Sequence, residues 1–180
     1  MEGVKSVIEE LILVRHGKAE DRAEMADDTQ RALTDKGIRE LQRTLPGLVS
    51  LIGAQRNTLL WSSPLKRAAQ TAAFIADSLG IADVNEFEFI GDGDWKAFSR
   101  KLAGVKQPGC LIVVGHQPYL SDWSQSLAGL PLPFKKGAAA GFRLNSSSPL
   151  KGELLWFLQP KALKRLDIRS ADFPPPMPPA

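Results

Sequence analysis

The chain has 180 residues, of which 43% are hydrophobic and 24% charged, and its formal net charge is +3. This length and composition are typical of one globular domain with a sizeable core. The basic residues form no stripe of Lys and Arg with interleaved aromatic side chains, which excludes the usual nucleic-acid-binding surface. A pocket for an anionic substrate needs only a few arginines and remains compatible with this charge.

Cys110 is the one cysteine, so an intramolecular disulfide is excluded, and its place inside an apolar run predicts a packing role. Residues 1–10 lack the apolar segment of a secretory signal. No apolar run approaches the roughly 18 residues of a membrane span. We therefore expect a cytoplasmic protein without a membrane partner.

The two ends of the chain differ from its middle. We predict a flexible leader over residues 1–9, one domain over residues 10–168, and a proline-rich, disordered tail over residues 169–180. The run from Phe173 to Ala180 is too rich in proline for a helix or sheet and favours polyproline conformations. Such a tail is either inert or a docking ligand for a partner.

Strand-like and helix-like patterns alternate between these ends. Short continuous runs of Val, Ile and Leu are typical of buried strands, whereas apolar residues three or four apart indicate helices. The patterns predict strands at residues 11–14, 58–61, 84–89, 110–114, 139–144 and 154–158, and helices at about 35–51, 64–79, 95–103 and 118–127. The alternation predicts an α/β fold, a three-layer α/β/α sandwich with a mostly parallel central sheet.

Capping residues predict where two of these helices begin. Thr34 is expected to be the N-cap of the first helix. Ser63 is expected to cap the second, with Pro64 at its first position, where proline is favoured, and Gly80 at its end. Residues 84–89 alternate apolar and polar side chains, as a half-buried or edge strand would.

The only two histidines each follow a predicted buried strand. Arg15-His16-Gly17 follows residues 11–14, and Gly115-His116 follows residues 110–114. In open α/β sheets, ligands bind beyond the carboxyl ends of the strands. One histidine in such a place is often a cap or a hydrogen-bonded core residue. Two of them in a chain with no other histidine favour a functional site.

A third strand-to-helix turn, at residues 62–67, places Arg67 in the first turn of a predicted helix. Helix N-termini attract anions through their free N–H groups and dipole. Taken singly, Arg15 could pair with a surface carboxylate and Arg67 could be a solvated helix residue. Together with two histidines, these arginines predict a cationic site for an oxyanion.

These motifs closely resemble the histidine phosphatase superfamily, whose fold is phosphoglycerate-mutase-like. Arg15-His16-Gly17 matches its signature triplet, residues 62–72 resemble its second segment, and Gly115-His116 resembles its third. The short chain, residues 115–122 and the segment 136–141 leading into a strand are similar to the SixA-like phosphohistidine phosphatase branch. The resemblance spans about Leu11 to Lys161.

The resemblance implies a covalent mechanism in which neutral His16 attacks phosphorus in line and water then hydrolyses the phosphorylated histidine. It implies that Arg15, Arg67 and His116 bind the phosphoryl oxygens, with Gly17 also in the substrate-binding set. We expect no cofactor and no metal, because arginines neutralise the charge and no third histidine exists to complete a nitrogen-rich metal site.

The family's proton donor to the leaving group is usually a glutamate, and here the pattern departs from it. Glu88 lies near the expected place, but its spacing to Gly93 is one residue longer than expected. Asp21, Asp92 and Asp94 are rivals, and any of the four could be a plain loop carboxylate. A poor acid matters less for phosphohistidine, which leaves as neutral imidazole when its free ring nitrogen is protonated.

The expected function is removal of phosphate from phosphohistidine in signalling proteins, so the expected partner is a phosphorylated protein or a small phosphorylated molecule, and not a nucleic acid. One alternative is a phosphomonoesterase for a small phosphorylated metabolite. Another is a phosphate-binding module without turnover. A flavodoxin-like signalling or nucleotide domain would need a glycine-rich phosphate loop or an acidic phosphoacceptor cluster, and the sequence has neither.

Overall fold

The computed structural model describes residues 8–24, 26–53, 57–106 and 109–166. Its centre is a six-stranded sheet in the order β3-β2-β4-β1-β5-β6. The strands are β1 (Ile8–Arg15), β2 (Thr58–Ser62), β3 (Val84–Glu86), β4 (Gly109–Gly115), β5 (Ala139–Ser147) and β6 (Leu150–Leu158). The helices are α1 (Asp35–Ile52), α2 (Lys66–Leu79), α3 (Glu88–Asp92), α4 (Trp95–Ala103), α5 (Tyr119–Ala128) and α6 (Pro160–Leu163), with short 3-10 turns η1 (Arg22–Glu24) and η2 (Asp28–Gln30).

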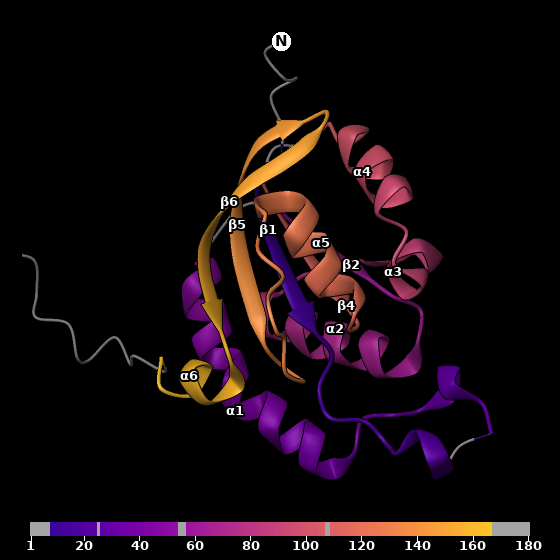
Figure 1. The fold of residues 1–180 in the computed structure, drawn as a ribbon. Coiled ribbons are helices and arrows are strands. Elements are labelled where there is room, and N and C mark those ends of the chain that lie inside the picture. The colour runs from indigo at the N-terminus through magenta and orange to yellow at the C-terminus, as the bar shows by residue number, and fades with distance from the viewer. Residues whose placement is uncertain (1–7, 25, 54–56, 107–108, 167–180) are drawn as a thin grey trace, which may run out of the picture.

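The sheet is mostly parallel, as the sequence predicts. β4 pairs in parallel with both β1 and β2, and β2 pairs in parallel with β3. Only β5 runs the other way, between β1 and β6. The carboxyl ends of β1, β2 and β4 therefore meet at one end of the sheet, which Figure 1 shows at the arrowhead of β1.

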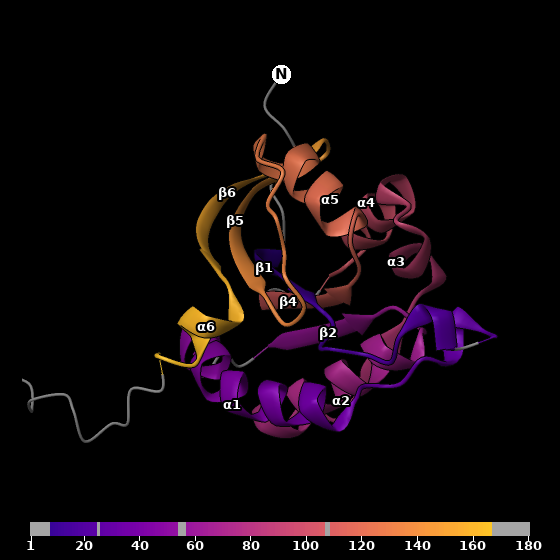
Figure 2. The same cartoon turned by 60° about the horizontal axis from the view of Figure 1, so that its bottom comes forward.

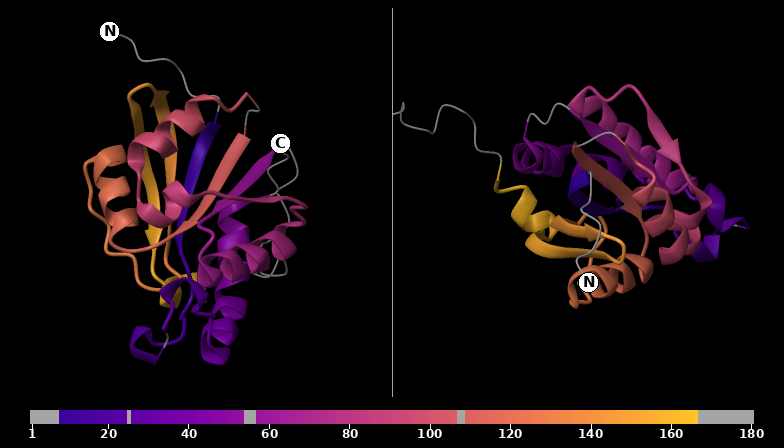
Figure 3. Two further views of the ribbon diagram at one scale, coloured as in Figure 1. Left: turned by 90° about the vertical axis from the view of Figure 1, so that its right-hand side faces the viewer. Right: turned by 90° about the horizontal axis from the view of Figure 1, so that it is seen from above.

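Helices cover both faces of the sheet and complete the predicted three-layer sandwich (Figure 2). Leu11 and Leu13 pack with α3, α4 and α5, whereas Ile12 and Val14 pack with α1, α2 and α6. Figure 3 shows the two layers, orange α5 and pink α4 on one side of the strands and purple α1 and magenta α2 on the other. Because alternate side chains of β1 enter two different cores, the strand reads as one continuous apolar run.

Cys110 lies on β4 in the core between the sheet and α1 and α2, as its place in the apolar run predicts. Burial raises the pKa of its thiol to about 12, so the sulfur stays protonated and unreactive at neutral pH.

The first helix begins as predicted, and the second does not. The Thr34 hydroxyl accepts a hydrogen bond from the Gly37 N–H at 3.0 Å and caps α1. The prediction that Ser63 caps α2 is wrong, because α2 begins only at Lys66. The Ser63 backbone is still tied to the sheet, where its N–H donates to the Val114 carbonyl at 3.1 Å. Its hydroxyl instead accepts from the Leu65 N–H, in the turn that precedes the helix.

The predicted strand at residues 84–89 is too long by three residues. β3 ends at Glu86, and Glu88 begins the short helix α3. Phe87 and Ile90 both pack into the core on the α4 and α5 side of the sheet, and their spacing of three residues is helical. The alternation of apolar and polar residues over this stretch is typical of a strand, so the sequence pattern does not reveal the helical spacing of Phe87 and Ile90. The four-residue helix α6 was also not predicted.

The chain ends extend beyond what the structure describes. β1 begins at Ile8, which is buried, so the strand reaches two residues into the predicted leader. Residues 1–7 and 167–180, which hold the rest of that leader and the proline-rich tail, lie outside the described residues. One domain over residues 10–168 stays a prediction. Among the described helices, none combines the length and the apolar character needed to cross a membrane.

Candidate active site

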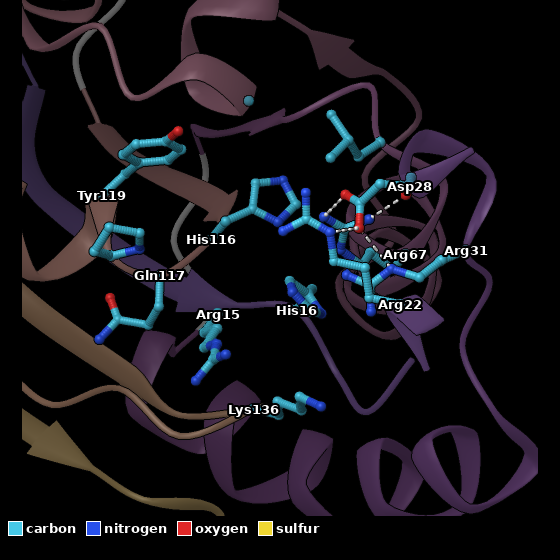
Figure 4. Close-up of a pocket in the computed structure, with 13 residues that line it drawn as sticks. Arg15, His16, Arg22, Asp28, Arg31, Arg67, His116, Gln117, Tyr119 and Lys136 are labelled. Carbon is cyan, nitrogen blue, oxygen red and sulfur yellow. Dashed lines mark hydrogen bonds and ion pairs between the residues drawn. The ribbon is translucent and has the colours of Figure 1, made fainter. Parts of the chain in front are cut away.

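A cavity of about 480 Å³ opens where the carboxyl ends of β1, β2 and β4 meet. The structure brings together four of the predicted site residues, Arg15, His16, Arg67 and His116, in its wall (Figure 4). Three strand-to-helix turns supply them, so the convergence expected from parallel strand ends is present. The wall also contains Arg22, Asp28, Arg31, Leu65, Gly91, Gln117, Pro118, Tyr119 and Lys136, which the sequence did not identify as site residues.

The His16 ring is held in one tautomer. Its Nδ1 lies 2.7 Å from the Gly17 carbonyl oxygen, and a carbonyl only accepts, so Nδ1 carries the proton. The other nitrogen, Nε2, then carries the free lone pair of a neutral imidazole. The His116 ring lies beside it, with 5.0 Å between the ring centroids. His16 is therefore arranged as a base or nucleophile at Nε2.

Both histidines are neutral at physiological pH. Burial, followed by the neighbouring His116, lowers the pKa of His16 to about 3. Burial and the Arg67 guanidinium lower the pKa of His116 to about 4. Each ring is only 5% exposed, and a second positive charge beside the arginines would be unfavourable. A neutral His16 retains the lone pair that nucleophilic attack requires.

These pKa values predict how stability depends on pH. Below about pH 6.5 the unfolded chain binds protons at both histidines, whereas the folded chain stays neutral until about pH 4. The contribution of the two rings is thus present above pH 6.5 and is lost as the pH falls toward about 4 for His116 and about 3 for His16. Denaturant unfolding should give a lower free energy of unfolding at pH 5 than at pH 7.5. Between pH 7.5 and pH 5, the free energy of unfolding of a His16→Gln/His116→Gln variant should decrease less than that of the wild type. If NMR shows either ring of the folded protein titrating near pH 6.5, the lowered pKa values are wrong.

Several buried N–H donors of the wall have no hydrogen-bond partner within the described part of the chain. They are Nε of Arg15, Nε of Arg67 and the one ring nitrogen of His116 that carries its proton, since neither ring nitrogen of His116 has a partner in that part of the chain. Buried donors are almost always satisfied, and exceptions indicate a ligand site. Arg15 is oriented by its Nη1, which donates to the Phe134 carbonyl at 2.7 Å. An oxyanion in the cavity would satisfy these donors.

Asp28 is a carboxylate of the site that the sequence analysis missed. Arg67 donates from Nη1 to the Asp28 carbonyl at 2.7 Å and from Nη2 to its Oδ2 at 3.0 Å. Arg31 Nε forms an ion pair with Oδ1 at 2.9 Å, and the more exposed Arg22 does so at 3.7 Å. Burial alone would raise the pKa of Asp28, but Arg67, Arg31 and Arg22 together hold it below its ordinary value. The carboxylate is therefore anionic and fixes the position of Arg67.

Two predicted site residues lie outside the cavity wall. Glu88 is exposed at the first position of α3 and is not among the lining residues. Gly17 lies behind His16, where its N–H donates to the Thr71 hydroxyl at 3.1 Å and is not available to a phosphate.

The three rival carboxylates also lie outside the wall. Asp94 caps α4 by accepting from the N–H groups of Lys96 and Ala97. Asp21 and Asp92 are exposed and absent from the wall. The carboxylate that the structure brings to the cavity is Asp28 instead.

The charge of the wall favours an anion. The part of the wall that the structure describes contains one carboxylate, Asp28, and five cationic side chains: Arg15, Arg22, Arg31, Arg67 and Lys136. Within the residues described, no group of three or more His, Cys, Asp and Glu side chains is placed to hold a metal ion. The arrangement combines an unprotonated imidazole nitrogen with fixed cationic donors, which is suited to attack on a phosphoryl group.

Solved structures share this fold. The chain is similar to the protein histidine phosphatase SixA in complex with tungstate, with a TM-score of 0.67 and 22% identity over 86% of this chain and 99% of that one. It is also similar to a mycobacterial glucosyl-3-phosphoglycerate phosphatase in complex with inorganic phosphate, with a TM-score of 0.58 and 15% identity over 85% and 99% of the two chains.

Sequence comparison gives the family. An uncharacterized protein of Picosynechococcus sp. (strain PCC 7002) is 33% identical over 164 residues, which cover 86% of this chain and 98% of that protein. The family model described as histidine phosphatase superfamily (branch 1) matches residues 11–109, more than half of the chain. The chain therefore belongs to the histidine phosphatase superfamily, branch 1, and by that membership is a phosphatase-type hydrolase.

Proposed function

We propose that this chain is a metal-independent phosphatase that forms a covalent phosphohistidine at His16 and removes phosphate from phosphohistidine in signalling proteins. The fold similarity to SixA supports the substrate class. The cavity supports the chemistry, because a neutral imidazole lies among cationic donors that an oxyanion would satisfy.

The first step is an in-line displacement at phosphorus. The lone pair of His16 Nε2 forms the new P–N bond, and the bond to the substrate nitrogen breaks with its electron pair going to that nitrogen. The phosphorylated imidazole keeps its proton on Nδ1, where the Gly17 carbonyl accepts it and stabilises the positive ring. Water then attacks phosphorus, releases phosphate and returns the lone pair to Nε2.

Arg15, Arg67 and His116 hold the phosphoryl oxygens during both steps. Negative charge on these oxygens persists through a loose transition state, and preorganised donors stabilise it at no reorganisation cost. His116 contributes as a neutral donor, because its pKa is lowered to about 4. The arginines neutralise the charge, which is the task that a metal ion performs in other phosphatases.

The carboxylates near the cavity support phosphohistidine, and not an alkyl phosphate, as the substrate. The carboxylate in the described wall of the cavity is Asp28, and three arginines keep it ionised. Glu88 is exposed and is not among the residues that line the cavity. A site without a protonated carboxyl group is poorly suited to expel an alkoxide, which needs a proton in the transition state. It suits phosphohistidine, whose protonated ring leaves as neutral imidazole.

The test compares leaving groups in the wild type and in Glu88→Gln. We expect kcat/KM for a phosphohistidine peptide to exceed that for an alkyl phosphate of equal charge by at least about 10²-fold, the lower end of what a general acid contributes. Glu88→Gln should leave both values unchanged, because its side chain lies outside the cavity.

Comparable activity on the two substrates, together with a large loss on the alkyl ester in Glu88→Gln, would identify Glu88 as a general acid and favour a phosphomonoesterase for small metabolites. Absence of turnover on every substrate, with retained phosphate binding, would instead indicate a binding module.

A further inference from the structure

A second cavity of about 450 Å³ adjoins the active site. Arg15 and Lys136 line both cavities, so the two meet at these side chains. The rest of its wall comes from the segment after His16, from α1, from the loop before β5 and from the start of α6. We call it the lysine pocket; its lining residues are Arg15, Lys18, Glu40, Lys135, Lys136, Gln159, Pro160 and Lys161.

The charges of the lysine pocket are not compensated. Among the described residues of its wall, five side chains are cationic and Glu40 alone is acidic. None of these residues takes part in the four ion pairs found among the described residues. Burial is the largest cause that lowers the pKa of Lys136; Arg15, Arg31 and Lys18 lower it further, and Asp21 raises it.

The cations on the opposite wall of the active site are neutralised by a carboxylate. There Arg22, Arg31 and Arg67 all form ion pairs with Asp28. In the view of Figure 4 this cluster and Lys136 lie on different sides of His16. Cations that line one cavity without an ion-paired carboxylate repel one another, and an acidic group from outside the chain would relieve this repulsion on the Lys136 side.

The backbone of the lysine pocket is fixed by one side chain. Gln159 precedes α6, donates from Nε2 to the Pro133 carbonyl at 2.9 Å and accepts from the Lys135 N–H at 3.2 Å. These two bonds tie the loop before β5 to the start of α6. Lys135 and Lys161 are thus presented from a rigid support, although their own side chains are exposed.

We propose that the lysine pocket binds carboxylates on the surface of the phosphorylated protein, next to the phosphohistidine that enters the active site. The proposal rests on the proposed function, whose substrate it specifies further. Four of the five cations are lysines, which act as mobile, hydrated point charges. Lysine also binds phosphate, but as a point charge and without the two-pronged grip by which arginine holds a single phosphate group. Lysines instead favour a dispersed acidic surface, which they attract over a distance.

The experiment compares two synthetic peptides that carry one phosphohistidine each. One has Asp and Glu around it, and the other has Asn and Gln at the same positions. The variant is Lys135→Glu/Lys161→Glu, because these two lysines line the lysine pocket and not the active site. At low salt, kcat/KM on the acidic peptide should fall about tenfold or more, mainly through KM, and high salt should remove most of the difference.

The neutral peptide and phosphoramidate should be hydrolysed at the wild-type rate by this variant. A matched control, Lys96→Glu/Lys106→Glu, changes the net charge equally at exposed positions on and just after α4, in the other helical layer. It should behave as the wild type does on all substrates. A milder variant, Lys135→Gln/Lys161→Gln, should give an intermediate loss on the acidic peptide.

Equal losses on both peptides, or equal losses in the Lys96→Glu/Lys106→Glu control, would overturn the proposal. Calorimetric titration of the unphosphorylated acidic peptide tests it without turnover, and weaker binding to Lys135→Glu/Lys161→Glu is the supporting result. A larger loss of inorganic polyphosphate binding than of peptide binding in Lys135→Glu/Lys161→Glu would contradict the carboxylate assignment. If no P–N substrate is hydrolysed, the proposed function is refuted, but the proposal for the lysine pocket is not. Calorimetry would then still test whether this pocket binds the acidic peptide.

Discussion

Replacing His16 by alanine should lower kcat by on the order of 10⁴-fold or more, the size of loss seen when a hydrolase loses its covalent nucleophile. Among the histidines in the described wall of the cavity, His16 is the one whose tautomer is fixed by a backbone carbonyl, which leaves the lone pair on Nε2. The arginines cannot replace it because they are protonated, and the Asp28 carboxylate is engaged by three of them. Steady-state kinetics on phosphoramidate and on a phosphohistidine peptide measure the loss.

His116→Ala is the informative comparison. This variant should be impaired less, because it removes a donor to the phosphoryl oxygens and leaves the nucleophile in place. Circular dichroism and thermal unfolding should show that both variants keep the fold, since each ring lies at the end of the sheet and not in its core. A His16→Ala enzyme that retains more activity than His116→Ala would reverse the two roles.

Arg67→Ala should lower kcat/KM by about 10²–10³-fold, as expected for the loss of one preorganised charge-stabilising donor. Arg67→Lys should be impaired as well, though less, because a point charge cannot reproduce a two-pronged guanidinium contact. Lys66→Ala is a matched control, because Lys66 is the exposed neighbour of Arg67 on α2 and is not part of the cavity wall. Activity of Arg67→Lys equal to that of the wild type would show that guanidinium geometry is unimportant.

Asp28 should act through Arg67, as a positioning residue. Asp28→Asn keeps the size of the side chain but weakens its ion pairs with Arg67 and Arg31, so Arg67 should lose its orientation. We expect a loss in kcat/KM smaller than that of Arg67→Ala. The double variant Asp28→Asn/Arg67→Ala should be no worse than Arg67→Ala alone, because the two residues act as one unit. Additive losses would show that Asp28 acts independently of Arg67.

The parts of the site that the sequence predicts are those fixed by local pattern. His16 and His116 follow buried strands, and parallel strands place their carboxyl ends at the same edge of a sheet. Arg67 follows β2 by the same logic. Asp28 could not be found in this way, because its role depends on a contact with Arg67, 39 residues away, made by a polar segment without hydrophobic periodicity. A carboxylate three residues before Arg31 was the one local signal.

The secondary structure predicted from the sequence is wrong at two places, where a local sequence pattern competes with tertiary contacts. Ser63 and Pro64 satisfy the rules for a helix start, but the hydrogen bond from Ser63 to β4 keeps this residue attached to the sheet and delays α2. At Phe87 and Ile90, packing against the core imposes a helical turn on a stretch that reads as a strand. In both segments, contacts with distant residues determine the secondary structure, and these contacts cannot be read from the local sequence.

The most direct test of a covalent phosphohistidine mechanism is rapid-quench trapping of the enzyme during turnover, followed by mapping of the modified residue. The structure predicts one phosphoryl group on His16, attached at Nε2 because Nδ1 carries the proton. The label should be acid-labile and base-stable, disappear when substrate is exhausted, and be absent from His16→Ala. Label of equal yield in His16→Ala, or attachment at His116, would contradict this mechanism.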